Sequence, residues 1–245
     1  SHILFYMAEG KFLMVDGLDG AGKGVVIDSL KEYFIEKGLK IFDLRDYWKN
    51  NNEIPELSEV QEYDVICSAE PTFSMVGKVI REELVRDNNR KYSGLSTAHA
   101  FALDREILYK KLLIPAKAAG KIIIQERGVI TSAVYQPMQL ERINLKDIMN
   151  LPGNRLALKN APDILIIIKV EPSVVIDRLQ KRGKKDHAIF ENLVFQRRVE
   201  ERYESGWLKK LFENFKTKVI YLDTNPPRTI EDTKNNSIKI WEDHN

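Results

Sequence analysis

Six short apolar runs are spaced along the chain and separated by longer amphipathic stretches. The runs cover residues 11–16, 40–44, 64–68, 121–125, 163–170 and 218–223. Continuous runs rich in Ile and Val are typical of strands that are covered on both faces of a sheet. The stretches between them predict helices over residues 25–37, 75–86, 96–119, 172–182, 191–214 and 227–242. This alternation predicts an α/β fold with a parallel sheet between layers of helices.

Two segments do not follow this alternation. Residues 46–63 are polar, contain Pro55 and show no clear period, so they predict a surface insertion to which the sequence assigns no function. Residues 181–190 place four cations close to Gly183, between two predicted helices. A solvated loop is one interpretation of this cluster, and a mobile lid that covers bound phosphate is the other.

The length and charge of the chain narrow its class. A chain of 245 residues (1–245) fits a single α/β domain, with residues 1–10 as an N-terminal extension whose first two residues resemble a cloning remnant. The formal net charge of +2 creates no strong field for nucleic acid or for an anionic membrane, so neither is an expected partner. No apolar run approaches the roughly 18 residues that a membrane span needs. Cys67 is the single cysteine and excludes an internal disulfide, which favours a cytoplasmic protein.

A glycine-rich stretch follows the first predicted strand and precedes the first predicted helix. Residues 17–24 read GLDGAGKG and match the phosphate-loop pattern G-x-x-x-x-G-K-[ST] at every position but the last. Glycines allow successive backbone N–H groups to face one anion, and the helix that follows adds its positive end. The stretch predicts a nucleotide-binding loop in which Lys23 neutralises the β- and γ-phosphates. The predicted contacts are Gly17, Asp19, Gly20, Ala21, Gly22, Lys23, Gly24 and Val25.

Three further motifs follow this loop: EPT at 70–72, FALDRE at 101–106 and ERGVITSAVYQ at 126–136. Together with the loop, their order and spacing resemble the thymidylate kinase family of nucleoside monophosphate kinases. The resemblance runs from about residue 11 to residue 223 and omits 46–63. It implies a P-loop NTPase fold with a central five-stranded parallel sheet and a mobile lid. It also implies a homodimer that transfers the γ-phosphoryl group of ATP to dTMP with Mg²⁺.

The resemblance implies roles for residues on the acceptor side. Phe101 is the expected ring that stacks on thymine, although ordinary core packing is an alternative for it. Arg105 lies one helical turn later on the same face and is the expected donor to a base carbonyl. Arg127 is expected to clamp the acceptor phosphate with its planar guanidinium, and Asp19 to lie near the sugar hydroxyl and that phosphate. The other expected substrate contacts are Glu70, Pro71, Thr131, Tyr135 and Gln136.

Phosphoryl transfer needs positioned oxygens and neutralised charge more than covalent chemistry by the protein. The resemblance implies an arginine beside the transferred phosphate, which comes either from the loop or from the lid. Because position 20 is glycine, we expect the lid to supply it, with Arg182 as the first candidate. The lesser candidates are Lys184, Lys185 and Arg197. The predicted catalytic residues are Lys23, Arg127, Arg182 and Asp19.

The chain departs from the family pattern at several positions near the phosphates. Gly24 and Val25 replace a pair of hydroxyl residues, one of which normally ligates magnesium, and Ala69 stands where many bacterial members have arginine. Glu126, our predicted metal ligand, replaces an aspartate, and Gly128 replaces an aromatic residue. Glu126 either compensates for the hydroxyl missing at Gly24 or differs independently and forms an ion pair or orients a metal-bound water.

These departures leave two alternatives to dTMP phosphorylation. A pocket rebuilt around Gly128 would suit a kinase for another nucleoside monophosphate. Loss of the metal-side hydroxyl would suit a catalytically impaired protein that binds nucleotide and acts as a regulator. Since water readily completes the octahedral shell of Mg²⁺, we expect a working kinase.

Overall fold

A six-stranded parallel sheet forms the centre of the protein. The computed structural model describes residues 8–138, 143–181 and 188–245. The strands are β1 (Phe12–Asp16), β2 (Ile41–Asp43), β3 (Val65–Ala69), β4 (Ile122–Glu126), β5 (Ile164–Lys169) and β6 (Lys218–Asp223). They lie in the order β2-β3-β4-β1-β5-β6, and every neighbouring pair is parallel. Each predicted run forms a strand whose ends lie within one residue of the expected ones, and the α/β class is confirmed.

The expectation of five strands was wrong. Strand β2 has only three residues, all of them half-buried, and it lies at the edge of the sheet. It pairs with β3 alone, from Ile41↔Val65 to Asp43↔Cys67. A strand this short, bonded on one side, adds little buried apolar surface, although the apolar run at 40–44 did predict it.

The central strands form the core. All five residues of β1 are buried, and so are all five residues of β3. Strand β1 pairs with β4 on one side and β5 on the other, with Leu13 opposite Ile124 and Ile164. Burial on both faces explains why these strands are apolar at consecutive positions, apart from Asp16 and Ser68, and do not alternate.

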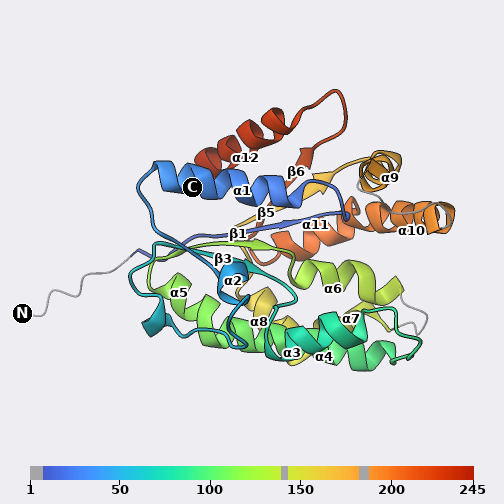
Figure 1. Cartoon of the computed structure of the whole chain (residues 1–245), viewed down its shortest axis with the longest axis horizontal. Helices are drawn as coiled ribbons and strands as arrows, with labels where there is room; N and C mark the ends of the chain where they lie inside the picture. The colour runs from blue at the N-terminus through green and yellow to red at the C-terminus, as the bar shows by residue number, and fades with distance from the viewer. Residues whose placement is uncertain (1–7, 139–142, 182–187) are drawn as a thin grey trace, which may run out of the picture.

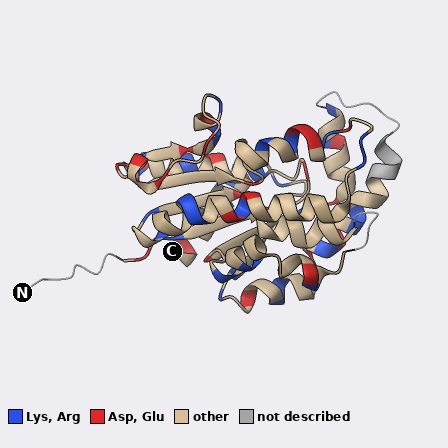
Figure 2. Ribbon diagram, turned by 90° about the horizontal axis from the view of Figure 1, so that it is seen from below, with Lys and Arg blue, Asp and Glu red and all other residues tan. Residues whose placement is uncertain are grey.

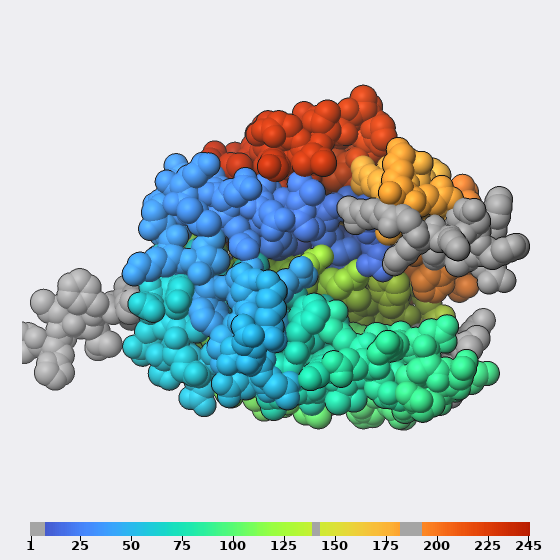
Figure 3. All heavy atoms as spheres, viewed as in Figure 1, coloured from blue at the N-terminus to red at the C-terminus, as the bar shows by residue number. Residues whose placement is uncertain are grey.

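One face of the sheet is covered by α1 (Lys23–Glu36) and α12 (Ile230–His244). These helices are far apart in sequence but lie in direct contact (Figures 1 and 3). The ring of Phe34 meets Trp241 edge-on, with 5.0 Å between ring centroids. Helix α12 begins at Thr229, whose hydroxyl accepts a hydrogen bond from the Asp232 N–H and so caps the first turn.

The other face carries α4 (Gly94–Leu108), α5 (Ile114–Ala118) and α8 (Pro152–Lys159) (Figure 1). The predicted helix at 96–119 consists of α4, a π-helical turn (Tyr109–Leu113) and α5 in direct succession. Helix α8 packs closely on α4 at Gly153, because a Cβ there would lie 1.8 Å from the Ala102 carbonyl oxygen. This contact requires glycine and holds α4 in place beside the sheet.

The remaining helices show where periodicity was informative and where it was not. They are α3 (Met75–Val79), α6 (Val129–Tyr135), α7 (Leu145–Met149), α9 (Pro172–Lys181), α10 (Ala188–Tyr203) and α11 (Gly206–Glu213). The predicted helix at 191–214 is two helices, since Ser205 begins the second as its N-cap. Helices α6, α7 and α8 were not predicted, because five to eight residues are too few to establish a helical period.

The segment 46–63 is anchored to the core more firmly than a surface insertion. Helix α2 (Leu44–Tyr47) leads into it, and a 3₁₀ turn (Leu57–Glu59) lies near its end. Trp48, Ile54 and Val60 are buried, and the Trp48 indole donates to the carbonyl of Glu53. These three apolar residues lie six apart, a spacing that fits neither a strand nor a helix and therefore gave no signal.

Charged side chains are distributed over the helices. Lys and Arg are interspersed with Asp and Glu on the face shown in Figure 2. Within the described residues, no helix is long and apolar enough to cross a membrane. Of the expected lid at 181–190, residues 182–187 lie outside the described part of the chain.

Candidate active site

The carboxyl ends of three neighbouring strands bring the predicted motifs together. Strands β3, β4 and β1 are adjacent in the sheet, and Ala69 and Val15 both pair with Glu126. The phosphate loop, the EPT segment and Arg127 follow these strand ends directly. In parallel sheets, ligands bind outside the carboxyl edge, so the topology places the three segments at one site.

The phosphate loop joins β1 to α1 in a conformation that glycine makes accessible. Gly22 precedes α1 with φ 112° and ψ 19°, a left-handed conformation in which a Cβ would be strained. The first N–H groups of a helix have no partner within the helix, so those that follow Gly22 are available to an anion. The loop is thus built as a phosphate-binding site.

The side chain of Lys23 folds back over this loop. Its Nζ donates to the carbonyls of Gly17, at 2.9 Å, and Leu18, at 2.7 Å, and the nearest carboxylate oxygen is 4.0 Å away on Asp19. Only 5% of Lys23 is exposed. Burial lowers the pKa of Lys23 from 10.5 to about 8, with the nearby Arg127 adding to the effect. A buried cation with so little compensation would gain strongly from a phosphate.

Arg127 lies beside the same carboxylate as Lys23, that of Asp19. The backbone of Arg127 has φ 66°, a left-handed conformation that turns the chain at the end of β4. The guanidinium pairs with Asp19 and lies 3.6 Å from Asp16, which is fully buried. Burial opposes its charge, but the two aspartates dominate and raise the pKa of Arg127. Two carboxylates, Asp16 and Asp19, therefore lie close to both the loop lysine and the arginine.

These groups border one cavity of about 390 Å³. It is lined by Asp19, Gly20, Gly22, Lys23, Gly24, Val25, Arg45, Glu70, Phe73, Arg81, Glu126 and Arg127. One end is the phosphate loop, and the other is formed by the segments that follow β2, β3 and β4. Donor and acceptor of a phosphoryl group could therefore meet inside a single enclosure.

Phe73 and Arg81 belong to the cavity and were missed from the sequence. The Phe73 ring is 40% exposed, and the guanidinium carbon of Arg81 lies 3.6 Å from its centroid. The Arg81 Nε donates to the carbonyls of Pro71 and Thr72, which fixes the side chain beside the ring. Phe73 follows the EPT motif directly in the sequence, and Arg81 lies just after the end of α3. This proximity to the motif was the available signal.

Arg105 is a buried residue that holds part of the cavity lining in place. It is 1% exposed and donates to Glu70 at 2.7 Å, to the Ser132 hydroxyl at 3.1 Å and to the Gly128 carbonyl at 3.1 Å. A further bond reaches Asn154 on α8. Glu70 also accepts from Gln125, at 2.6 Å. The guanidinium is thus engaged with protein groups and orients Glu70, which does line the cavity.

Five other predicted substrate residues are not among the cavity lining. The Thr131 hydroxyl donates to Asp16 at 2.5 Å, and Gln136 donates to Ser132 at 3.2 Å. Tyr135 packs against Phe195 and Tyr203, with centroid distances of 6.2 and 6.3 Å. Phe101 is half-buried on α4. Pro71 contributes its carbonyl to Arg81, as described above. Of the predicted acceptor contacts, Asp19, Glu70 and Arg127 border the cavity.

The comparisons with known proteins agree with this geometry. The sequence model of the family described as thymidylate kinase matches residues 51–236, well over half of the chain. The chain belongs to the thymidylate kinase family. The matched region begins after the phosphate loop, so the loop supports the assignment independently of the family match.

Individual relatives support the assignment. A thymidylate kinase from Caldicellulosiruptor saccharolyticus is 30% identical over 205 residues, which cover 84% of this chain and 85% of the relative. A probable thymidylate kinase from Pyrococcus horikoshii is 30% identical over 199 residues, or 79% of this chain and 81% of the relative. The crystal structure of thymidylate kinase from Ehrlichia chaffeensis matches with a TM-score of 0.60 at 20% identity, covering 96% and 100% of the two chains. The predicted family, P-loop kinase fold and enzyme class are confirmed.

Two of the chain's departures from the family pattern have a structural explanation. A Cβ at Gly128 would lie 2.4 Å from Cε of Met14, so Met14 occupies the space that a larger residue would need. Glu126 forms an ion pair with Arg45, as one of the two interpretations of this residue expects. At Gly24 an added Cβ would meet no atom within 4 Å, so nothing in the fold prevents a hydroxyl residue there.

A second cavity of about 310 Å³ lies on the other side of the phosphate loop. Arg178 of α9 crosses it and donates to the carbonyls of Ala21, at 3.2 Å, and Thr224, at 2.7 Å. Lys181, Arg228 and Ile230 also line it. The expected lid arginine, Arg182, and the lesser candidates Lys184 and Lys185 lie outside the described residues, whereas Arg197 is exposed on α10.

Proposed function

We propose that this chain transfers the γ-phosphoryl group of ATP to dTMP within the 390 Å³ cavity. The observation that carries the proposal is that Lys23 and Arg127 border one cavity and both lie beside the same carboxylate, that of Asp19. Lys23 belongs to the donor loop and Arg127 to the acceptor side. Family membership supports the same reaction.

On the donor side, the loop amides and Lys23 would hold the β- and γ-phosphates of ATP. The second cavity adjoins the same loop, and its mostly apolar lining beside Arg178 suits the adenine ring. A bound γ-phosphate would point from the loop into the larger cavity. Catalysis then follows from positioning and charge neutralisation, with Lys23 and Arg127 stabilising the negative oxygens in transit.

On the acceptor side, we propose Phe73, in addition to Phe101, as a candidate for base stacking. The Phe73 ring borders the cavity, and Arg81 lies beside it as a donor for a base carbonyl. Arg127 would clamp the acceptor phosphate. Arg105 would act through Glu70, which it holds at 2.7 Å, without touching the substrate.

Magnesium is an expected partner of ATP here. Within the described residues no group of three or more His, Cys, Asp or Glu side chains could hold a metal ion by itself. Mg²⁺ in kinases commonly takes only one or two carboxylates and otherwise phosphate and water oxygens, so Asp19 or Glu126 would contribute an oxygen only by leaving its ion pair with Arg127 or Arg45. When bound, the ion would neutralise charge on the phosphate oxygens.

A panel of nucleoside monophosphates tests the substrate. With ATP and Mg²⁺ in an ADP-release assay, dTMP should give the largest kcat/KM. We expect dUMP to be about 10- to 200-fold poorer, because it lacks one methyl contact in the base pocket. Preference for AMP, GMP or CMP would contradict dTMP specificity. ATP binding without turnover of any monophosphate would instead favour a nucleotide-binding regulator.

We also propose that the kinase is a homodimer formed through α4 and its neighbour. Leu95 and Leu103 are about half exposed on one side of α4, and Val79 at the end of the adjacent α3 is 54% exposed. Analytical ultracentrifugation should give twice the chain mass of 28.3 kDa. Leu103→Lys should shift it to the monomer, whereas Ile35→Lys, an exposed apolar position on α1, should not. A monomeric parent protein would refute the dimer.

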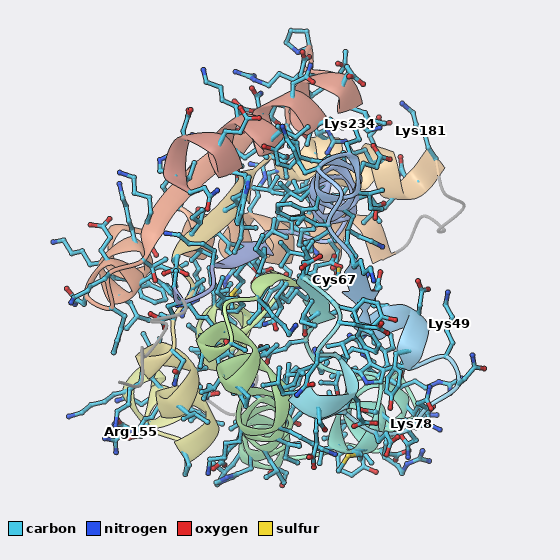
Figure 4. The ribbon with its side chains drawn as sticks, turned by 90° about the vertical axis from the view of Figure 1, so that its left-hand side faces the viewer. Lys49, Cys67, Lys78, Arg155, Lys181 and Lys234 are labelled. Atoms are coloured by element: carbon cyan, nitrogen blue, oxygen red, sulfur yellow. The ribbon has the colours of Figure 1, made fainter. Side chains whose placement is uncertain are left out.

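The cytoplasm is the proposed compartment. Cys67 is a free, buried cysteine in β3 (Figure 4), and burial raises the pKa of its thiol to about 12. Such a thiol is unreactive and packs as a small apolar group. A reducing compartment that also supplies ATP fits both features.

A further inference from the structure

The edge strand β2 delivers a cation to the active site. Arg45 follows β2 and lies in the first turn of α2. Its backbone N–H donates to Asp43 at 2.9 Å, and Asp43 is itself fixed by Lys31 of α1 at 2.6 Å. The start of the Arg45 side chain is therefore held in place, while 44% of the side chain remains exposed.

The side chain extends toward the acceptor side of the cavity. Arg45 pairs with Glu126 at the end of β4, although β3 lies between β2 and β4 in the sheet. The guanidinium must therefore reach past the end of β3. That strand ends at Ala69, which pairs with Glu126 in the register and is the position where many family members carry arginine. A methyl group there leaves room for a cation from the neighbouring strand.

The charges around the cavity are unbalanced without an anion. Arg45, Lys23, Arg81 and Arg127 all line it. Burial is the main cause of the lowered pKa of both Lys23 and Arg81. Repulsion by Arg127 and Arg45 adds to the effect on Lys23, and repulsion by Arg45 adds to the effect on Arg81. Of the carboxylates that line the cavity, Glu70 is already engaged by Arg105. The remaining two, Asp19 and Glu126, face four cations.

We propose that Arg45 is a ligand of the acceptor phosphate, and that Glu126 holds its guanidinium at the cavity until the nucleotide binds. This rests on the proposed function and adds a residue to it. Arg45 exchanges a carboxylate partner for a phosphate, and the Glu126 carboxylate is released as the exchange occurs. The cation missing at position 69 is thus supplied from β2, an adjacent strand.

Binary binding measurements test this directly, without ATP or Mg²⁺. Titration calorimetry with dTMP and with thymidine separates the phosphate from the nucleoside. Arg45→Ala should weaken dTMP binding about 10-fold or more and leave thymidine binding within about twofold, since a charge-assisted bond to phosphate is lost. Arg45→Lys should recover part of the loss. Glu126→Gln should strengthen dTMP binding, because the competing carboxylate is removed.

Lys49→Ala is the matched control. Lys49 lies just after α2 and projects from the edge of the molecule (Figure 4), with 72% of its side chain exposed and paired to Asp46. Lys49→Ala should change neither the affinity for dTMP nor the affinity for thymidine. Thermal unfolding of each variant checks that the fold is kept.

The outcomes separate this proposal from the proposed function. Equal losses of dTMP and thymidine binding in Arg45→Ala would assign Arg45 a purely structural role and overturn the proposal. Unchanged dTMP binding would overturn it as well, while leaving the kinase activity intact. If the unmodified protein prefers another monophosphate, the calorimetry uses that nucleotide and its nucleoside in place of dTMP and thymidine. If it binds none, both the proposed function and the role of Arg45 fail.

Discussion

Replacing Lys23 by alanine should lower kcat about 100- to 1,000-fold. Lys23 is the loop cation that would contact the transferred phosphate, and removal of one preorganised charge donor from an active site typically has this effect. The affinity for dTMP in the absence of ATP should change little, because the acceptor contacts remain. Steady-state kinetics at saturating ATP and dTMP, with calorimetry of dTMP alone, provide the measurement.

The pH dependence gives a second measurement of the same lysine. The pKa of Lys23 is lowered to about 8 in the free enzyme, so the side chain is charged below that pH and neutral above it. Affinity for ATP should therefore be full below pH 8 and fall as the pH rises through it. Lys37→Ala, at the exposed end of α1, should keep this profile, and Lys23→Ala should flatten it. Turnover of Lys23→Ala close to that of the parent enzyme would remove Lys23 from the mechanism.

Replacing Arg105 by methionine should destabilise the fold by about 3–5 kcal/mol. Arg105 and Glu70 form an ion pair that is about 1–2% exposed, and loss of one partner leaves a buried charge without compensation. Ser132, Asn154 and the Gly128 carbonyl would lose a donor at the same time. For a chain of this size, about 2–4 °C per kcal/mol predicts a melting temperature about 10 °C lower.

Two variants distinguish the loss of the buried Arg105–Glu70 ion pair from a general loss of core packing. Arg155→Met removes an exposed arginine from α8 (Figure 4) and should leave the melting temperature nearly unchanged. Adding Glu70→Gln to Arg105→Met should restore part of the stability, because the uncompensated carboxylate is gone. If Arg105→Met unfolds at the parent temperature, the buried network contributes nothing to stability, and contact with the substrate becomes the better explanation of Arg105.

The strands and the phosphate loop could be predicted because their signals are local. A strand buried on both faces must be apolar at consecutive positions, and all six runs formed strands within one residue of the expected bounds. The loop depends on glycines at fixed spacing before a helix, as Gly22 shows with its left-handed conformation. Short helices such as α6 and α7 were not predicted, because their helical conformation depends on packing against other elements and not on a detectable apolar period.

The acceptor side shows the limit of this local reasoning. Phe101 and Arg105 share a helix face, as their spacing predicted, but spacing cannot say what that face meets. Phe73, from the segment after β3, borders the cavity. Arg105 is enclosed by Glu70, Ser132 and Asn154, which are 27 to 49 residues away in sequence.

The sequence alone determined the family, the alternation of strands and helices, and the glycine-rich loop between β1 and α1. Each of these depends on neighbouring residues, whose apolar period and backbone freedom are properties of short segments. Only the tertiary structure decided which side chains surround the acceptor cavity. Arg45 and Glu126 lie 81 positions apart in sequence and meet because the strand order β2-β3-β4 brings two strand ends within reach of one guanidinium.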